Sequence, residues 1–275
     1  MSPDAPDAFG LLVCPVCGDG LARRAGGLGC PAGHSFDLAR QGYVNLLTGN
    51  ARSGTADTPD MVAARAAFLA AGHYAPLTGA VARAAAEEAP GTVLDAGTGT
   101  GHYLAAVLDA LPGATGLGLD VSKFALRRAA RAHPRARAAV WDLWRPLPVR
   151  TGAVDLVLNV FAPRNAAEFH RVLRPGGTLL VVTPGPDHLA ELRAGMLEVD
   201  ADKDERLDRA LSGHFRQVDR VPLEYPMTLT PAEAADAVGM GPSAHHAERR
   251  ASTGASPAEP VRVTASFRLS RYRPA

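Results

Sequence analysis

The residues best suited to bind a charged small molecule follow a short apolar run. Residues 92–94 are apolar or β-branched and lead directly into Asp95. Three glycines at alternate positions come next, ahead of a helically spaced segment: Gly97, Gly99 and Gly101. This order predicts a strand, a tight turn and a helix, and glycines leave no Cβ between such a turn and a ligand. A carboxylate beside the turn disfavours phosphates and suits a cationic amino-acid group.

Two further acids end predicted strands. Residues 116–119 lead to Asp120, about 20 residues beyond the turn, where a ribose-binding carboxylate belongs in nucleotide-binding α/β folds. Residues 138–141 lead to Asp142. With later strands at 154–158 and after 173–177, the set resembles the motifs of class I S-adenosylmethionine (SAM) methyltransferases. The resemblance implies an α/β, Rossmann-like domain in which Asp95, the three glycines, Asp120 and Asp142 contact SAM.

A second chemical group lies near the N-terminus. All three cysteines and one histidine form the pattern C-x2-C-x12-C-x3-H: Cys14, Cys17, Cys30 and His34. Three thiolates and an imidazole at this spacing predict a tetrahedral Zn²⁺ site. A disulfide framework would leave one thiol unpaired, in a chain without a secretion signal. Four protein ligands close the coordination sphere, so we expect one structural zinc ion that does no chemistry.

The predicted division of the chain is a zinc-binding module at residues 1–47, a connector at 48–58 and a methyltransferase domain at 59–275. The module is too poor in large apolar side chains to fold without metal. Its sequence leaves two roles open. It either grips RNA, with Arg23, Arg24 and Arg40 as candidate contacts, or forms a structural lid on the larger domain.

Composition limits the partners. The 275 residues carry 29 basic and 28 acidic side chains, a net charge of +1, so a nucleic-acid surface has to be local. Arginines at 127, 128, 131, 135 and 137 follow Ser122, a predicted helix cap; they favour a solvated face first and phosphate contact second. No apolar run approaches the ~18 residues of a membrane span. We expect a soluble, cytosolic protein that does not enter membranes.

The pattern also predicts the remaining elements. A helix capped by Thr58 runs from Pro59 to Ala71, and a second helix reaches Glu88. Residues 188–211 are helical and charged in pattern. Beyond them we expect a strand at 215–225, a helix at 232–240 and a final alternating strand at 261–269.

Most of the chain resembles one family. The matching stretches are residues 14–34, 36–47, 61–74, the glycine loop, 159–165, 183–189 and 240–242. They are similar to the RlmA family of 23S rRNA guanine-N1 methyltransferases, and most similar to its actinobacterial branch, which includes the tylosin-resistance methyltransferase. The resemblance implies that Tyr74, Gly99, Thr100 and His188 contact SAM. It also implies a homodimer that binds a 23S rRNA hairpin, and protection from tylosin-type macrolides. One departure is His245, followed by His246, where the family places a tryptophan.

Methyl transfer to guanine N1 requires removal of the N1 proton or stabilisation of the O6 enolate. Topology suggests Asn159 as a hydrogen-bond partner of the guanine edge and Phe161 as a stacking partner. Two alternatives stay open at this stage. The chain is either a small-molecule methyltransferase with a zinc lid, or a non-catalytic RNA-binding factor that keeps a relic SAM fold.

Overall fold

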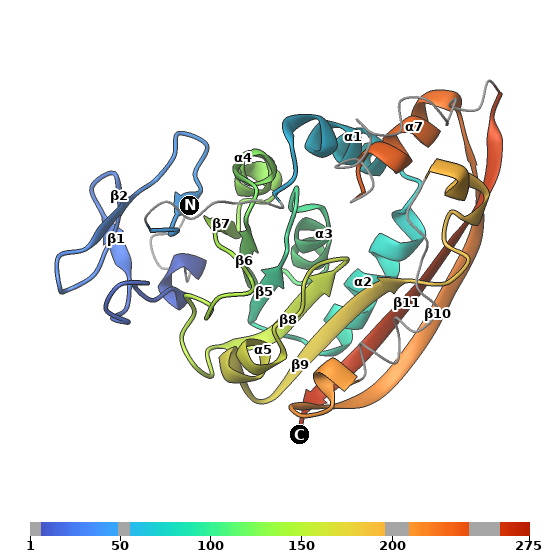
Figure 1. Cartoon of the computed structure of the whole chain (residues 1–275). Coiled ribbons are helices and arrows are strands. Elements are labelled where there is room, and N and C mark those ends of the chain that lie inside the picture. The colour runs from blue at the N-terminus through green and yellow to red at the C-terminus, as the bar shows by residue number, and fades with distance from the viewer. Residues whose placement is uncertain (1–6, 49–55, 196–208, 242–258) are drawn as a thin grey trace.

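A mixed eight-stranded sheet forms the centre of the molecule (Figure 1). The computed structural model describes residues 7–48, 56–195, 209–241 and 259–275. From one edge to the other, the strands are β10 (Phe215–Leu229), β11 (Val261–Pro274), β9 (Leu173–Pro184), β8 (Val154–Val160), β5 (Thr92–Ala96), β6 (Thr115–Asp120), β7 (Ala136–Val140) and β4 (Val44–Asn45). The strands from β4 to β9 are parallel, and β11 is antiparallel to both neighbours.

The strand order reverses at β5, and we refer to the carboxyl edge of the sheet between β5 and β8 as the crevice. After β5 the chain moves outward through β6 to β7, and then crosses back to β8 on the other side of β5. The loops that follow β5 and β8 therefore diverge at the carboxyl ends of neighbouring strands. In open α/β sheets, ligands bind at this point of reversal.

Helices and the zinc module cover the two faces of this sheet. Neighbouring residues of a strand point to opposite sides, so Leu156 and Leu158 join one hydrophobic cluster while Val157 joins another. The first face is covered by α2 (Ala75–Glu87), α3 (His102–Ala110) and α4 (Lys123–Ala132). The opposite face packs against α5 (Ala166–Val172) and the zinc module. Burial on both faces explains why these strands are apolar throughout.

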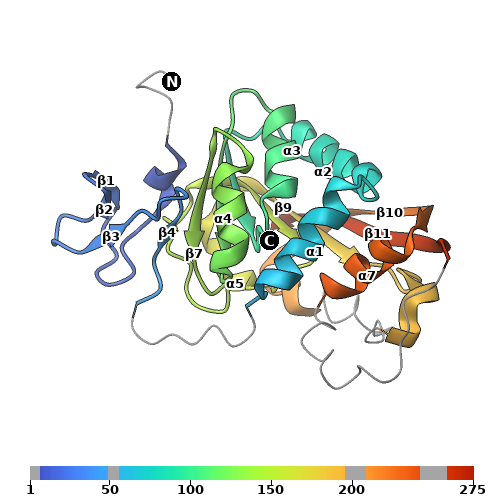
Figure 2. The ribbon, with the colours of Figure 1, turned by 90° about the horizontal axis from the view of Figure 1, so that it is seen from above.

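The predicted helix caps are confirmed. Helix α1 (Pro59–Ala70) begins where the Met61 amide donates to the Thr58 hydroxyl at 3.2 Å. Ser122 caps α4 in the same way. Helix α7 (Pro231–Gly239) packs against α1 (Figure 2) and starts with a reciprocal pair of cap hydrogen bonds between Thr230 and Glu233. Each capped helix starts within one residue of its predicted position.

The zinc module shares its core with the larger domain. It consists of η1 (Ala8–Leu11) and a small antiparallel sheet of β1 (Ala22–Arg24), β2 (Gly27–Gly29) and β3 (Ser35–Asp37), followed by β4. Strand β4 extends the large sheet beside β7. The Val13 amide donates to the Pro148 carbonyl at 2.9 Å, and Leu12 pairs with Val149. Phe9 and Leu12 are buried in the cluster that contains Leu119, so the module is docked firmly.

The C-terminal third differs most from prediction. Within the stretch predicted as helix, the structure has the short 3-10 helix η2 (Ala190–Gly195) and a last helical turn at 209–211, and residues 196–208 lie outside the described part. The two final strands run four or five residues beyond their predicted ends. His245 and His246 also lie outside the described residues.

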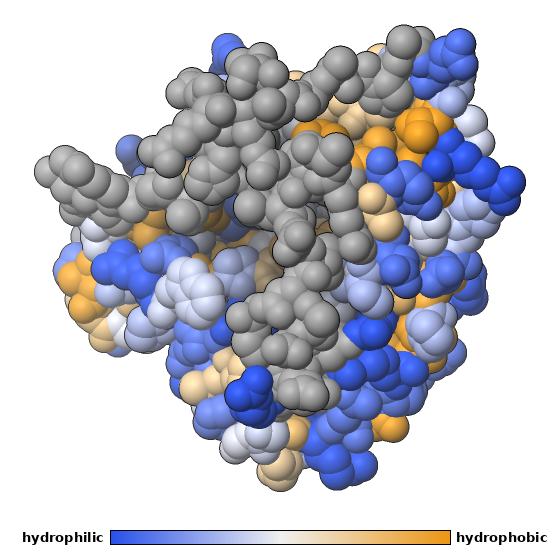
Figure 3. Space-filling model, turned by 45° about the vertical axis from the view of Figure 1, so that its right-hand side comes forward, coloured by the Kyte–Doolittle hydropathy of each residue, from blue (hydrophilic) through white to orange (hydrophobic). Residues whose placement is uncertain are grey.

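The described residues include no helix that could span a bilayer. From the side that carries β10 and β11, the surface is a mosaic of hydrophilic and hydrophobic areas (Figure 3).

Candidate functional site

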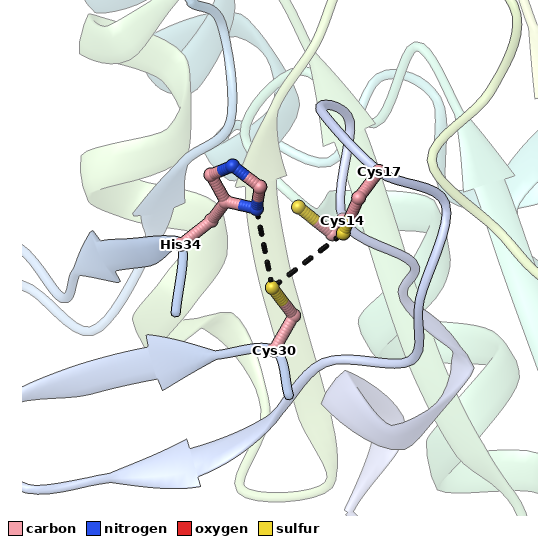
Figure 4. A group of neighbouring side chains, drawn as sticks. All are labelled: Cys14, Cys17, Cys30 and His34. Carbon is pink, nitrogen blue, oxygen red and sulfur yellow. Dashed lines mark hydrogen bonds between the residues drawn. The ribbon is translucent and has the colours of Figure 1, made fainter. Parts of the chain in front are cut away.

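The four predicted metal ligands converge in the zinc module. One ligand atom from each of Cys14, Cys17, Cys30 and His34 lies within 4.8 Å of the others (Figure 4). The Sγ atoms of Cys17 and Cys30 are 3.6 Å apart, and Cys30 Sγ is 3.4 Å from His34 Nδ1. A tetrahedral zinc ion with Zn–S near 2.3 Å and Zn–N near 2.05 Å has S–S edges of about 3.8 Å and S–N edges of about 3.6 Å. The side chains are therefore spaced to hold Zn²⁺.

Two tight turns aim these ligands. Gly18 donates its amide to the Cys14 carbonyl at 2.8 Å, and Gly33 donates to the Cys30 carbonyl at 3.1 Å. Both glycines have positive φ, +79° and +89°, which side chains with a Cβ rarely adopt. With four protein ligands, the site has no coordination position for a substrate, so its metal stabilises the fold.

Two of the candidate RNA contacts in the module are engaged internally. Arg23 pairs with Asp7 and lies over the Phe9 ring, 5.1 Å from its centroid. Arg24 donates to the Cys30 carbonyl at 3.2 Å. Both side chains hold the module together. Arg40 is exposed, and the described residues offer it no hydrogen-bond or ion-pair partner.

The glycine loop joins β5 to α3 and lines the crevice. Gly97, Gly99 and Gly101 have φ values of +90°, +53° and +82°. A Cβ on Gly97 would lie 2.2 Å from that of Ala162, and one on Gly101 would lie 2.9 Å from the Ala129 Cα. Glycine is needed at these two positions by close approach as well as by φ. Thr100 is half-buried between Gly99 and Gly101.

Asp120 stands at the end of β6 and organises the loop. One carboxylate oxygen accepts the Gly99 amide at 2.9 Å, and the other accepts the Ser122 amide at 2.8 Å. Burial raises the pKa of Asp120, while the two amides lower it. The carboxylate keeps acceptor capacity on both oxygens, as the predicted ribose contact requires.

Asp95 is the more deeply buried acid, with 2% of its surface exposed. Burial raises its pKa to about 7. A buried carboxylate without a cationic partner is costly, and a bound ammonium group would favour the charged form. This is the electrostatic setting expected for the amino-acid end of SAM.

Tyr74 and His188 meet at the crevice although 114 residues separate them. The Ser266 amide donates to His188 Nδ1 at 3.3 Å, so the neutral imidazole carries its proton on Nε2 and donates it to Tyr74 Oη at 3.0 Å. Burial raises the pKa of Tyr74, so the phenol stays neutral and its own hydrogen can be donated to a ligand. Both rings pack on Phe267, with centroid distances of 5.0 and 4.6 Å.

Asp142 follows β7, which lies two strands away from β5 in the sheet. Its carboxylate accepts the Trp144 amide at 3.0 Å. The next side chain, Leu143, is buried and reaches within 3.6 Å of the Cβ position of Gly97. The segment thus lies against the loop, at the place predicted for adenine.

Asn159 is completely buried, at the end of β8. Its amide nitrogen donates to the carbonyls of Ala96 and Pro163, both at 3.0 Å. Both amide hydrogens are therefore used, and they tie the end of β5 to the loop after β8. This geometry favours a positioning role over the predicted direct contact with guanine, which stays a prediction.

Phe161 stands at the rim, with 42% of its surface exposed. Its φ of +54° is rare for a bulky residue, and such strain persists where surrounding structure enforces it. Its ring centroid lies 5.7 Å from that of Phe267 and 6.5 Å from that of Tyr74. A strained, half-exposed ring beside a cofactor crevice is suited to stacking on a planar substrate.

Several buried polar atoms near the crevice have no hydrogen-bond partner among the described residues. They are Tyr103 Oη, Asn159 Oδ1 and Thr183 Oγ1. Unpaired buried polar groups are rare and call for an explanation. Together with Asp95 and Asp120, they form a polar lining that fits a ligand rich in amino, carboxylate and hydroxyl groups, as SAM is.

Comparisons with known proteins match both the zinc module and the domain that carries the glycine loop. The model of the RlmA N-terminal zinc ribbon matches residues 12–53, and a methyltransferase domain model matches residues 93–177. A protein of Micromonospora griseorubida, assigned as a 23S rRNA (guanine-N(1)-)-methyltransferase, is 53% identical over 98% of this chain and 99% of its own length. This chain belongs to the RlmA family of 23S rRNA guanine-N1 methyltransferases.

Two other relatives extend the comparison. The 23S rRNA (guanine(748)-N(1))-methyltransferase of Streptomyces fradiae is 54% identical over 86% of each chain. YxjB of Bacillus subtilis, assigned as a 23S rRNA (guanine-N(1)-)-methyltransferase, is 36% identical over 67% of this chain and 68% of its own.

Sequence reasoning missed Arg65. Its guanidinium pairs with Asp57, donates to the Met240 carbonyl at 2.7 Å and lies 3.6 Å from the Cβ position of Gly99. It thus ties α1, the end of the connector and the end of α7 to the glycine loop. Its partners are up to 175 residues away, and no local pattern distinguishes it from other arginines of an alanine-rich helix.

Proposed function

We propose that this protein is a SAM-dependent methyltransferase that methylates N1 of a guanine in a hairpin loop of 23S rRNA. The observation that carries the proposal is the match along nearly the whole chain to enzymes of this activity, with zinc ribbon and cofactor crevice both present. The target named for the Streptomyces fradiae relative is guanine 748, and we propose the same guanine here.

We assign the residues of the crevice to different parts of SAM and to the target base. Asp95 holds the cationic amino group, Asp120 the ribose and Asp142 the adenine. Gly97, Gly99, Thr100 and Gly101 bring the backbone close to the cofactor, and Tyr74 and His188 close its methionine end. When bound, SAM supplies an electrophilic methyl group. Phe161 stacks on the target base, and Asn159 keeps the loop that carries Phe161 in register with β5.

Positioning is the main catalytic contribution in this proposal. Holding two reactants in line is worth roughly 7–11 kcal/mol of the barrier. A base has to leave its stack before N1 is accessible, which costs a few kcal/mol and less in a loop whose bases are partly splayed. A rigidly held aromatic ring replaces part of the missing base stacking. The strain at Phe161 supports this assignment, because a relaxed surface residue would not need that φ.

The direct test is methylation of a defined transcript. The zinc-loaded protein is incubated with SAM and a transcript of the 23S rRNA hairpin that contains guanine 748. We expect one primer-extension stop at that position, and no stop with a transcript that carries adenine there. Binding of SAM without methylation of the transcript would favour the small-molecule alternative. Binding of RNA without binding of SAM would favour the non-catalytic factor.

Three further expectations come from the family. We propose that the enzyme works as a homodimer in the cytoplasm and that its methylation protects ribosomes from tylosin-type macrolides. Sedimentation velocity tests the dimer. Drug susceptibility of a strain that lacks the gene, together with mass spectrometry of its 23S rRNA fragments, tests the protection.

A further inference from the structure

Several arginines among the described residues are held by acids. Their ion pairs include Arg65 with Asp57, Arg137 with Asp7, Arg171 with Glu168, Arg174 with Asp155, and Arg271 and Arg273 with Glu88. Arg135 is equally engaged, since it donates to three carbonyls around the end of α3. These side chains have structural partners.

Helix α4 is different. In ten residues it has four cations and no acid: Lys123, Arg127, Arg128 and Arg131. All four are exposed, and none has an ion-pair partner among the described residues. Phe124 is 39% exposed on the same helix, and the Arg127 guanidinium lies over its ring, 5.1 Å from the centroid. The opposite face of α4 is buried through Leu126 and Ala129.

The zinc module adds a fifth cation beside this helix. Residues 39–43 form a turn in which Gly42 donates to the Ala39 carbonyl, and Arg40 stands on this turn. The turn packs on α4, because Tyr43 joins the cluster of Leu126, and a Cβ on Gly42 would lie 3.9 Å from that of Ala130. Strand β4 follows at once and lies beside β7, next to α4 (Figure 2). Arg40 therefore stands on a turn that packs against α4, at the boundary between the module and the catalytic domain.

We infer that Arg40 and the exposed face of α4 form one phosphate-binding surface for the backbone of the RNA substrate. Unpaired cations concentrated on one face, in a protein of net charge +1, are the local electrostatic footprint expected of a nucleic-acid contact. Helix α4 begins directly after Asp120 and Ser122, so this surface starts beside the proposed ribose site. The zinc ribbon then acts in RNA binding through its docked turn, since Arg23 and Arg24 are engaged internally. This inference rests on the proposed function.

The test compares two triple variants. In Arg127→Gln/Arg128→Gln/Arg131→Gln the proposed surface loses three charges. In Arg83→Gln/Arg216→Gln/Arg262→Gln the same number of exposed arginines is removed elsewhere. Binding of the 23S rRNA hairpin transcript is measured by fluorescence anisotropy between 50 and 200 mM salt. SAM affinity is measured by calorimetry on the same proteins.

Each phosphate that the protein no longer neutralises reduces the slope of log affinity against log salt by about 0.7–0.9. We expect the slope of the α4 variant to fall by about 2, and its affinity for the transcript to fall on the order of tenfold. Its KM for RNA should rise while its SAM affinity and kcat stay close to wild type. Arg40→Gln should lower the slope by a further ~0.7, and the control variant should match wild type.

Unchanged RNA affinity and slope in the α4 variant, with wild-type methylation intact, would overturn the inference and leave the proposed function standing. Loss of dimer in this variant without loss of RNA affinity would assign the face to a second copy and also overturn it. Failure of the wild-type protein to methylate the transcript would instead remove the proposed function.

Discussion

The zinc site and the cofactor crevice differ in how complete they are without a bound organic ligand. The four metal ligands come from 21 consecutive positions and already face one another at tetrahedral spacing. The crevice draws on residues from Tyr74 to Ser266. It contains a carboxylate whose pKa burial raises to about 7, and several buried polar atoms that have no hydrogen-bond partner in the described part of the chain. The first site is complete with its metal alone. The second retains an electrostatic deficit that a ligand relieves.

The zinc site and the crevice therefore contribute to different properties of the protein. A closed site stabilises structure, and the ribbon around it is packed into the core of the catalytic domain through Phe9 and Leu12. A site with unpaired buried groups is less stable without its ligand, and binding of the ligand supplies the missing partners. Changes in the zinc site should therefore damage the fold first, and changes in the crevice should damage binding or rate with little loss of fold.

Removal of one zinc ligand should have the largest effect. Structural zinc sites bind with about 10–16 kcal/mol, comparable to the whole stability of a domain. We expect Cys30→Ser to lose its metal, measured by elemental analysis, and to lower the melting temperature of the entire protein because the core is shared. His34→Cys keeps four ligands and should retain zinc. A Cys30→Ser protein that melts like wild type would show that the module is an independent appendage.

Asp95→Asn should separate binding from folding. The amide keeps the shape of the side chain and removes the charge that attracts the ammonium group of SAM. We expect SAM affinity to fall about 100-fold by calorimetry, about 2.7 kcal/mol at 1.36 kcal/mol per tenfold. The unfolding free energy at pH 7 should stay the same or rise. Equal affinity for SAM in the variant and in wild type would remove Asp95 from the site.

The raised pKa of Asp95 also predicts a pH dependence of stability without cofactor. The folded-state value, about 7, lies above the ordinary value of 3.8, so the folded state binds more protons than the unfolded state between these limits. Stability from this group is present at low pH and is lost as pH rises from about 4 to about 7. The unfolding free energy of the wild type, measured with urea, should therefore fall between pH 5 and pH 8. In Asp95→Asn this fall should be smaller by on the order of 2–4 kcal/mol. Identical pH profiles would contradict the assignment.

Asn159→Ala should slow methylation without weakening SAM binding. It removes the donor that binds the Ala96 and Pro163 carbonyls and should cost about 1–3 kcal/mol of stability. We expect the single-turnover rate to fall at least tenfold because the Phe161 loop is released. Thr178→Val is the matched control, since Thr178 is a buried residue that donates to Glu88 far from the crevice. It should lose similar stability and keep its rate. An unchanged rate in Asn159→Ala would exclude both roles considered for this residue.

Phe161→Gly should change stability least. Relief of positive φ is worth about 1–3 kcal/mol and offsets the missing packing of the ring, so we expect a net change within about 1 kcal/mol. Methylation should fall several-fold because no ring stacks on the target base. Phe161→Leu keeps the backbone strain and removes the ring, and it should be slower as well. If the leucine variant keeps the full rate, Phe161 is a packing residue only.

The sequence was most informative where the chemistry is local. Thr58, Ser122 and the three glycines have roles set by neighbours within a few residues, and the zinc ligands follow a short, fixed spacing. The α/β class was equally accessible, because runs buried on both faces alternate with helical segments. The predicted last strand ended early because Arg271 and Arg273, which interrupt the alternation, pair with Glu88 from another element.

What the sequence could not show depends on distant partners. The two-residue strand β4 belongs to the large sheet only because Val44 meets Ala139. The hydrogen bond between Tyr74 and His188 and the place of Arg65 over Gly99 are likewise long-range. The burial of Asn159 was hidden because an asparagine after an apolar run reads as a polar residue at a strand end. The positive φ of Phe161 could not be predicted, because phenylalanine rarely adopts this conformation.

The most direct measurement is a crystal structure of the protein with S-adenosylhomocysteine. We expect the ligand to lie across Gly97 to Gly101, with its amino group toward Asp95 and its ribose on Asp120, and the zinc ribbon to be unchanged. A crevice that stays closed by its own side chains, or a ligand bound elsewhere on the sheet, would contradict this expectation.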